Sequence, residues 1–201
     1  MPTYSSNLKT MGFLYLETKK AASLRVQGLT ADEIKEKSLQ ENIFLMKTDI
    51  RKQEVASYIM NRLKTLDDFL LSKLATGSLS TSKLVAFLSI IKTDRLLYEF
   101  MREVFTEKIM LMDYTITARD FDSFFQRKSE QSEKVASWSD YTHGKIARTY
   151  KNILINAGLA KEDSTDKKKL HITKFLLEQE IIDHTKTTGD YDYLKTMIGG
   201  Q

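Results

Sequence analysis

The polar side chains between residues 138 and 159 are of types that contact nucleic acid. Arg148 and Asn152 are four residues apart, so they project side by side if this segment is helical. Arginine can donate two hydrogen bonds to guanine, and asparagine can pair with the edge of adenine. Lys145 and Thr149 fall on the same arc of a helical wheel and are suited to phosphate contact. These four residues are therefore candidate nucleic-acid ligands.

The rest of the segment contains the features that would position these side chains. On the opposite arc, apolar residues recur at intervals of three and four, which predicts that this arc is buried. They are Ile146, Ala147, Tyr150, Ile153 and Leu154. Ser139 can cap the start of the helix, and Gly158 suits its end, where a left-handed residue is common. A surface helix with a solvated outer face would show the same pattern, so both interpretations stay open.

A basic turn follows this helix in the sequence. Lys167, Lys168 and Lys169 precede Leu170–Ile172, a short segment with the character of a strand. Together with the chain after Leu159, this pattern predicts a short β-hairpin with a basic tip. A DNA-contacting helix followed by such a hairpin is typical of a winged helix-turn-helix. The alternative is an ordinary solvated turn.

A second candidate contact lies between residues 30 and 66. Thr30 and Glu33 form a capping-box pattern, which predicts a helix over residues 31–41. A short connection then leads to a longer predicted helix over residues 50–65. These lengths match the proportions of a helix-turn-helix.

The longer helix of this pair carries a basic stripe. Arg51, Tyr58 and Arg62 recur at intervals of seven and four, and Lys47 and Lys52 add charge near the helix start. The dipole of a helix also favours phosphate at that end. The alternative is structural, with Tyr58 at the edge of the core and Arg62 paired with a nearby acid.

The sequence lacks the motifs of an enzyme or a metal site. It contains no Cys, and its three histidines, His143, His171 and His184, do not have the spacing of metal ligands. No phosphate-binding loop and no nucleophile-elbow motif is present. We therefore expect no catalytic residues, no metal and no cofactor.

Composition favours a compact all-α fold of many helices. One Pro and eight Gly in 201 residues leave few helix breakers. We expect an N-terminal region with a helix-turn-helix (1–78), a central helical core (79–137) and a C-terminal helix-turn-helix or winged helix (138–201). The last helix is expected over residues 173–183, followed by a polar tail from residue 187 that frays.

Charge and hydropathy bound the partners only loosely. The net charge is +4, which is compatible with a polyanionic partner but too small to imply one. The longest apolar run, Leu84 to Ile91, is far shorter than the about 20 residues that a membrane helix needs, and predicts a buried core helix. With no signal-peptide pattern at the start, we expect a cytoplasmic monomer that does not enter the membrane.

Short motifs spread along the chain resemble one known family. In order, they are Gly12-Phe13-Leu14, Gln40-Glu41-Asn42, Asn61-Arg62-Leu63, Glu99-Phe100-Met101, Trp138-Ser139 and Ala157-Gly158-Leu159. Their order and spacing resemble the BrxA family of bacteriophage exclusion (BREX) systems over nearly the whole chain.

The resemblance implies an all-helical protein with two helix-turn-helix elements and a positive surface. It implies binding of double-stranded DNA, a part in antiviral defence, and other BREX proteins as partners. No catalytic residues carry over, and the contact residues named above come from the helical wheels alone. The family has also been likened in fold to the NusB antitermination protein, so an RNA-binding module remains an alternative. A scaffold that holds defence subunits together is the third.

Overall fold

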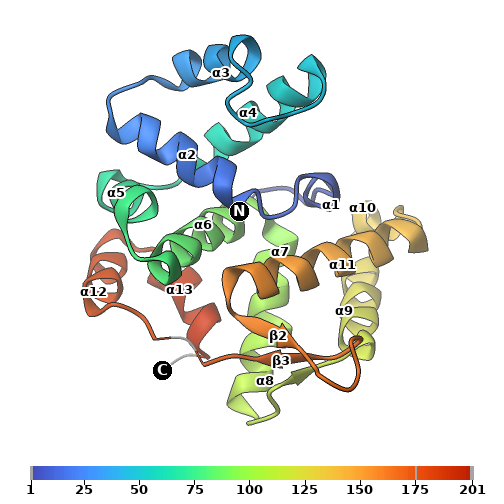
Figure 1. The fold of residues 1–201 in the computed structure, drawn as a ribbon. Coiled ribbons are helices and arrows are strands. Elements are labelled where there is room, and N and C mark those ends of the chain that lie inside the picture. Colours follow the sequence, from blue (N-terminus) through green and yellow to red (C-terminus); the bar gives the residue numbers. More distant parts are fainter. Residues whose placement is uncertain (1, 175, 200–201) are drawn as a thin grey trace. The chain divides into compact units, whose positions relative to one another are not determined.

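The computed structural model describes residues 2–174 and 176–199 of the chain. It is mostly helical with one small sheet, which confirms the expected all-α class (Figure 1). The chain divides into two compact units. Residues 13–93 form what we call the N-terminal unit. Residues 1–12 together with 94–201 form the C-terminal unit.

The N-terminal unit is built entirely from helices. They are α2 (Tyr15–Val26), α3 (Ala31–Gln40), α4 (Asp49–Leu63), α5 (Asp68–Thr76) and α6 (Leu79–Thr93). The predicted capping box starts α3, because the Thr30 amide donates to the Glu33 carboxylate at 2.7 Å and the Glu33 amide donates back to Thr30 Oγ1 at 3.2 Å. The apolar run in α6 is buried throughout, as expected of a core helix. Within the described parts of the chain, no helix has the length and apolar character needed to cross a bilayer.

The three regions expected from sequence divide the chain differently from these two units. Residues 79–93, which open the expected central region, form α6 and pack against α4 and α5. The buried side chains of α5 and α6 explain this grouping, since each helix covers an apolar face of its neighbour.

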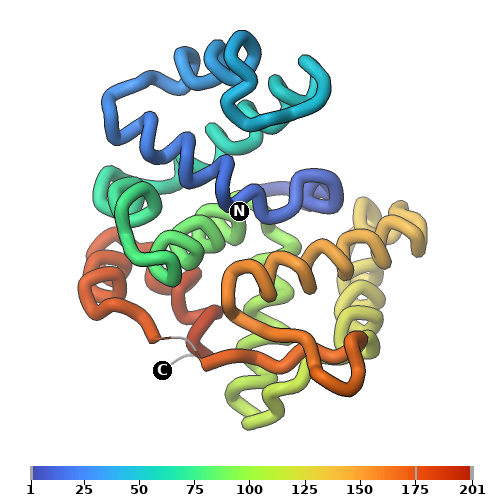
Figure 2. Tube along the Cα trace, viewed as in Figure 1, coloured from blue at the N-terminus to red at the C-terminus, as the bar shows by residue number. Residues whose placement is uncertain are grey.

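The C-terminal unit surrounds a small sheet with helices. Its elements are α1 (Leu8–Met11), α7 (Arg95–Phe100), a π-helical turn η1 (Met101–Phe105), α8 (Thr106–Met110), β1 (Thr115–Ile116), α9 (Ala118–Gln131), α10 (Glu133–Ala136), α11 (Asp140–Ala157), β2 (Ala160–Glu162), β3 (Leu170–Ile172), α12 (Gln179–Thr188) and α13 (Tyr191–Ile198). The tube in Figure 2 shows the chain leaving α11 and passing directly into the β2–β3 hairpin.

Aromatic side chains from three helices, α7, α9 and α11, fill the core of this unit. The ring of Phe100 stacks on Phe121 with centroids 4.8 Å apart. It meets the edge of Phe124 at 5.3 Å and the tilted ring of Tyr150 at 5.6 Å. Because Tyr150 lies on α11, this cluster fixes the inner face of that helix against α7 and α9.

A cluster of charged side chains is buried in the same unit. Glu99 accepts hydrogen bonds from Tyr4 Oη and Arg95 Nε, each at 2.8 Å. Lys128 Nζ lies 2.8 Å from Glu99 and 2.7 Å from Glu103. Burial would raise the pKa of the Glu99 carboxyl, but hydrogen bonds from Lys128, Arg95 and Tyr4 outweigh it and lower that pKa. Burial and the bond to Glu99 raise the pKa of Tyr4 to about 12.

The end of the chain differs from the sequence expectation. The helix predicted over residues 173–183 begins only at Gln179, and the expected polar tail contains α13. The chain forms α13 there because Leu194 and Met197, three residues apart, are buried on one face of that helix. Residue 175 of the predicted helix and residues 200–201 of the predicted tail lie outside the described residues.

Candidate nucleic-acid interface

Helix α11 has the two faces that its sequence predicts. Four residues of its predicted apolar arc, Ile146, Tyr150, Ile153 and Leu154, are at most 1% exposed, whereas the fifth, Ala147, is only half-buried. Arg148, Asn152 and Asn156 are exposed on the other side, and Lys145 and Thr149 are half-buried beside them. The helix therefore presents a continuous polar edge to solvent.

Both ends of α11 are capped as the sequence predicts. Ser139 Oγ accepts a hydrogen bond from the Thr142 amide at 3.3 Å. At the other end Gly158 has φ +82°, and the Leu159 amide donates to the Leu154 carbonyl at 2.9 Å. A Cβ on Gly158 would meet nothing within 4 Å, so the left-handed backbone, not crowding, is what favours glycine there.

Side chains on the polar edge of α11 lie close to the helix backbone. Arg148 Nε donates to the Gly144 carbonyl at 3.3 Å, and Thr149 Oγ1 donates to the Lys145 carbonyl at 3.0 Å. The Lys145 ammonium lies 5.7 Å from the ring centroid of Tyr141. The hydrogen bond to Gly144 uses only Nε of Arg148, so its two terminal nitrogens have no partner among the residues that the structure describes.

The predicted hairpin is present and is extended by a third strand. β2 and β3 pair antiparallel, with Ala160 opposite Ile172 and Lys161 opposite His171. β1 pairs with the other side of β3, so the sheet order is β1-β3-β2. Sequence analysis did not predict β1, whose two residues are too few to show a strand period.

The turn of the hairpin, residues 163–169, is organised by one carboxylate. Asp163 Oδ1 accepts from the amides of Thr165 and Asp166 at 2.7 and 2.8 Å and from the Thr165 hydroxyl at 2.6 Å. Its Oδ2 lies 2.5 Å from His171 Nε2. The Thr165 hydroxyl, the two amides and His171, in that order, hold the pKa of the Asp163 carboxyl well below its usual range.

We predict that Asp163→Ala disorders this turn without unfolding the protein. A carboxyl group whose pKa is lower in the folded than in the unfolded protein stabilises the fold at pH values above its unfolded pKa, about 3.9 for Asp. This stabilisation is lost as the pH falls through the folded pKa. In wild type the amide chemical shifts of Thr165 and Asp166, followed by NMR, should therefore titrate at a pH below that of an unperturbed Asp. In the variant this titration should vanish. A wild-type midpoint at the ordinary Asp value would contradict the role of Asp163.

Lys151 joins α11 to the hairpin. Its Nζ donates to the backbone carbonyl of Lys167 and lies 3.5 Å from the Glu162 carboxylate. The basic tip is thereby held beside the polar edge of α11. Sequence analysis did not select Lys151, because its hairpin partners lie more than ten residues away and no local pattern predicts them.

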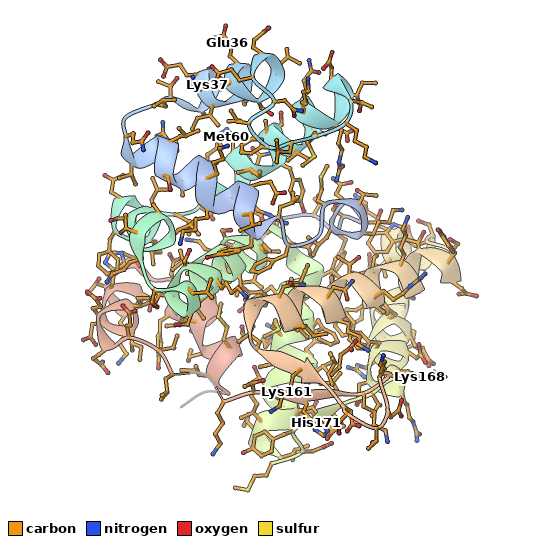
Figure 3. The ribbon with its side chains drawn as sticks, viewed as in Figure 1. Glu36, Lys37, Met60, Lys161, Lys168 and His171 are labelled. Carbon is orange, nitrogen blue, oxygen red and sulfur yellow. The ribbon has the colours of Figure 1, made fainter. Side chains whose placement is uncertain are left out.

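The three lysines of the turn are exposed, as expected of a basic tip. Lys169 lies 3.6 Å from Asp166, whereas Lys167 and Lys168 have no ion pair among the residues that the structure describes. Figure 3 labels Lys168 at the turn, with Lys161 and His171 on the strands. Lys161, which follows the buried Ala160 in β2, is a further exposed cation that sequence analysis missed.

The basic residues at the start of α4 are mostly engaged by nearby groups. Arg51 lies 3.3 Å from Glu54, and Lys52 lies 2.8 Å from Asp49. Lys47 is exposed in the loop before the helix. Positive charge on α4 is therefore partly neutralised within the helix itself.

The placement of Arg62 corrects the sequence expectation. Its side chain is 1% exposed, and its Nη1 donates to the Phe13 carbonyl at 2.6 Å. The guanidinium also lies 4.7 Å from the ring centroid of Tyr58. Arg62 is buried inside the N-terminal unit and is not on a contact surface, because a carbonyl distant in sequence takes its hydrogen bond.

Comparison with known proteins identifies the family of the chain. A family model described as BrxA matches residues 2–189. The chain is 41% identical to the BREX protein BrxA of Bacillus cereus, over 98% of this chain and 96% of that protein. The chain belongs to the BrxA family. It is also 20% identical to the BREX protein BrxA of Paramagnetospirillum magneticum, over 94% of this chain and 93% of that protein.

The fold is shared with a solved structure. A crystal structure described as that of an uncharacterized protein from Magnetospirillum magneticum superposes with a TM-score of 0.82. The match covers 98% of this chain and all of the other, at 20% sequence identity. The similarity shows that the two chains share a fold.

Proposed function

We propose that this protein is a non-enzymatic, double-stranded DNA-binding accessory protein of a BREX phage-defence system. In this proposal α11 lies in the major groove and the β2–β3 hairpin lies along the phosphate backbone. The membership of the chain in the BrxA family, with relatives named BREX proteins, supports the defence role. The proposal places the protein in the cytoplasm, where incoming phage DNA is found.

The order of elements in the C-terminal unit supports this mode of binding. β1 is followed by α9, the short α10, α11 and then two strands, and the sheet order is β1-β3-β2. Helices that precede a basic hairpin fit a winged helix-turn-helix, in which the second helix of the pair enters the major groove. In this assignment α11 is the recognition helix and residues 163–169 are the wing.

The observation that carries the proposal is the cluster of exposed cations beside the polar edge of α11. Lys151 ties the turn that bears Lys167 and Lys168 to the helix that bears Arg148 and Asn152. The lysines are suited to phosphates, which supply most of the affinity, and Arg148 and Asn152 are suited to base edges.

Helix α4 enters the proposal only as a weaker contact. Lys47, Arg51 and Lys52 remain candidate ligands of phosphate, but two of them already face carboxylates of their own helix. Arg62 is removed from the candidate set because it is buried.

A binding experiment with two competitors tests the proposed function. Fluorescence anisotropy with a labelled DNA duplex should give an affinity that falls steeply as salt is added, because phosphate contacts release counterions. Unlabelled duplex DNA should displace the probe at lower concentration than a structured RNA hairpin. Preferential displacement by the RNA would instead identify an RNA-binding protein. Absence of binding at low salt to either would reject nucleic-acid binding.

A further inference from the structure

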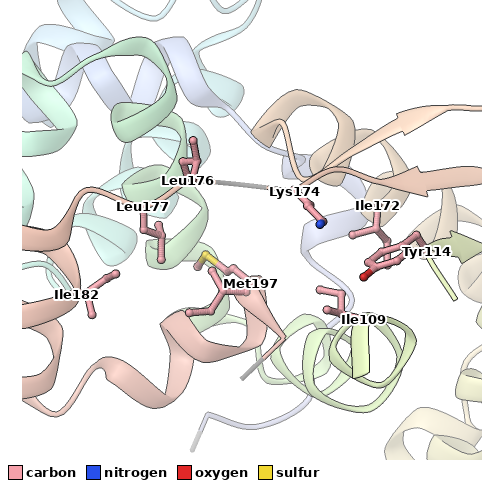
Figure 4. Close-up of a pocket in the computed structure, with 9 residues that line it drawn as sticks. Ile109, Tyr114, Ile172, Lys174, Leu176, Leu177, Ile182 and Met197 are labelled. Atoms are coloured by element: carbon pink, nitrogen blue, oxygen red, sulfur yellow. The ribbon is translucent and has the colours of Figure 1, made fainter. Parts of the chain in front are cut away.

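The C-terminal unit contains an open apolar groove at the end of β3 away from the hairpin turn. Its cavity measures about 450 Å³. In Figure 4, Ile172, Tyr114 and Lys174 lie on one side of this space, and Leu177, Ile182 and Met197 lie on the other. The lining comes from α8, Tyr114 before β1, the end of β3, residues 174, 176 and 177 after it, and helices α12 and α13.

Exposed apolar residues lie at the groove and in the chain segment between two of its lining residues. Leu176 at the groove is 96% exposed. Met110, Leu111 and Met112, between the groove residues Ile109 and Tyr114 in the chain, are between 69% and 79% exposed. Monomeric proteins seldom leave such apolar patches uncovered, and methionine-rich surfaces adapt to protein partners. The exposed Leu176 extends the apolar surface of the open groove, which fits a protein segment better than an enclosed small ligand.

The polar groups of the groove indicate the charge of its occupant. Lys174 and Tyr114 supply an ammonium and a hydroxyl, and no acidic side chain lines the cavity. Lys174 has no ion pair among residues 2–174 and 176–199. A cation beside apolar walls favours a partner that brings a carboxylate.

From these observations we infer that the groove binds a segment of a partner protein in which apolar side chains adjoin an acidic residue. The apolar side chains enter the cavity between α8, α12 and α13, and the acid pairs with Lys174. The surface is separate from the proposed DNA contact, since the hairpin turn and the groove lie at opposite ends of β3. Only the choice of candidate partners, the other proteins of the same defence system, rests on the proposed function.

The test uses the full chain and short overlapping peptides that span those other proteins, each labelled and measured by fluorescence anisotropy. Peptides with apolar residues next to Asp or Glu should bind. Leu176→Ser should weaken their binding roughly tenfold, because it removes an exposed anchor. Leu16→Ser is the matched control, since Leu16 is 74% exposed on α2 in the N-terminal unit.

A charge exchange tests the pairing with Lys174. Lys174→Glu should weaken the binding of the acidic peptides. The same peptides with Lys in place of the acid should bind this variant more tightly than the acidic peptides do. Lys134→Glu, at an exposed site on α10, should change neither. If no such peptide binds, or if the groove variants bind like wild type, the inference is overturned. A dimer in sedimentation that Leu176→Ser dissociates would assign the groove to a second copy and also overturn it.

Duplex binding measured on the same variants separates this inference from the proposed function. Leu176→Ser should leave the affinity for DNA unchanged. Loss of peptide binding with intact DNA binding would therefore concern the groove alone. Failure of wild type to bind DNA, with peptide binding intact, would reject the proposed function alone.

Discussion

Charge reversal at Lys145 and Arg148 together is expected to lower the affinity for duplex DNA by about 100-fold at low salt. Each substitution removes a cation from the polar edge of α11 and places a carboxylate where a phosphate would lie. Both side chains are on the solvent side of the helix, so Tm should change by no more than about 2 °C. Fluorescence anisotropy with a labelled duplex measures the affinity, and thermal unfolding by circular dichroism measures Tm.

A matched variant separates a local contact from a general loss of positive charge. Lys20→Glu with Lys186→Glu changes the net charge by the same amount, and both lysines are exposed outside α11. This control should bind within about threefold of wild type, because it keeps the cations of α11 and salt largely screens other surface charges. Equal weakening in the two double variants would show that α11 is not the contact.

Sequence patterns predicted α11 well because its determinants are local. The 3.6-residue period of its apolar arc, the Ser139 cap and the Gly158 end all act within one or two turns of helix. The same holds for the capping box before α3. The basic hairpin was predictable in outline, since the lysines and the following apolar residues are adjacent in the chain.

The features that sequence missed depend on distant parts of the chain. Nothing near Arg62 shows that it meets the carbonyl of Phe13, so its burial required the structure. β1 exists only because β3 pairs with it, more than fifty residues later. The α13 helix is a different case, because Leu194 and Met197 have helical spacing that the surrounding polar residues concealed.

The buried charge cluster also escaped sequence analysis. Lys128 is 3% exposed, yet it stands among polar residues in α9 and matches the pattern of a solvated face. Its partners Glu99 and Glu103 lie in α7 and η1, where the apolar period predicted only a core helix. A buried cation is recognised by its partners, and these become neighbours only after folding.

Lys128→Ala is expected to lower the free energy of unfolding by about 3–5 kcal/mol, more than any other substitution proposed. The reason is that it leaves two carboxylates near each other without their shared cation. For a chain of this size, Tm should fall by roughly 10 °C. Thermal unfolding measured at neutral pH checks this value. Lys134→Ala, at an exposed site on α10, should leave Tm unchanged.

The pH dependence of Tm tests whether the lost charge of Lys128 beside Glu99 and Glu103 is the cause. In wild type the pKa of Glu99 is lowered, so ionised Glu99 stabilises the fold at pH values above the ordinary pKa of Glu, about 4.3. This stabilisation is lost as the pH falls through the folded pKa. Without Lys128, burial and the neighbouring Glu103 act to raise the pKa of Glu99. As the pH falls, Glu99 should therefore be protonated in the variant at a higher pH than in wild type, which removes the repulsion between the two carboxylates. The gap in Tm between wild type and Lys128→Ala should narrow between pH 7 and pH 5. Adding Glu99→Gln to the variant should narrow the gap in Tm at pH 7 as well. A gap that neither the lower pH nor Glu99→Gln narrows would show that the variant loses stability through lost packing of the lysine stem and not through charge.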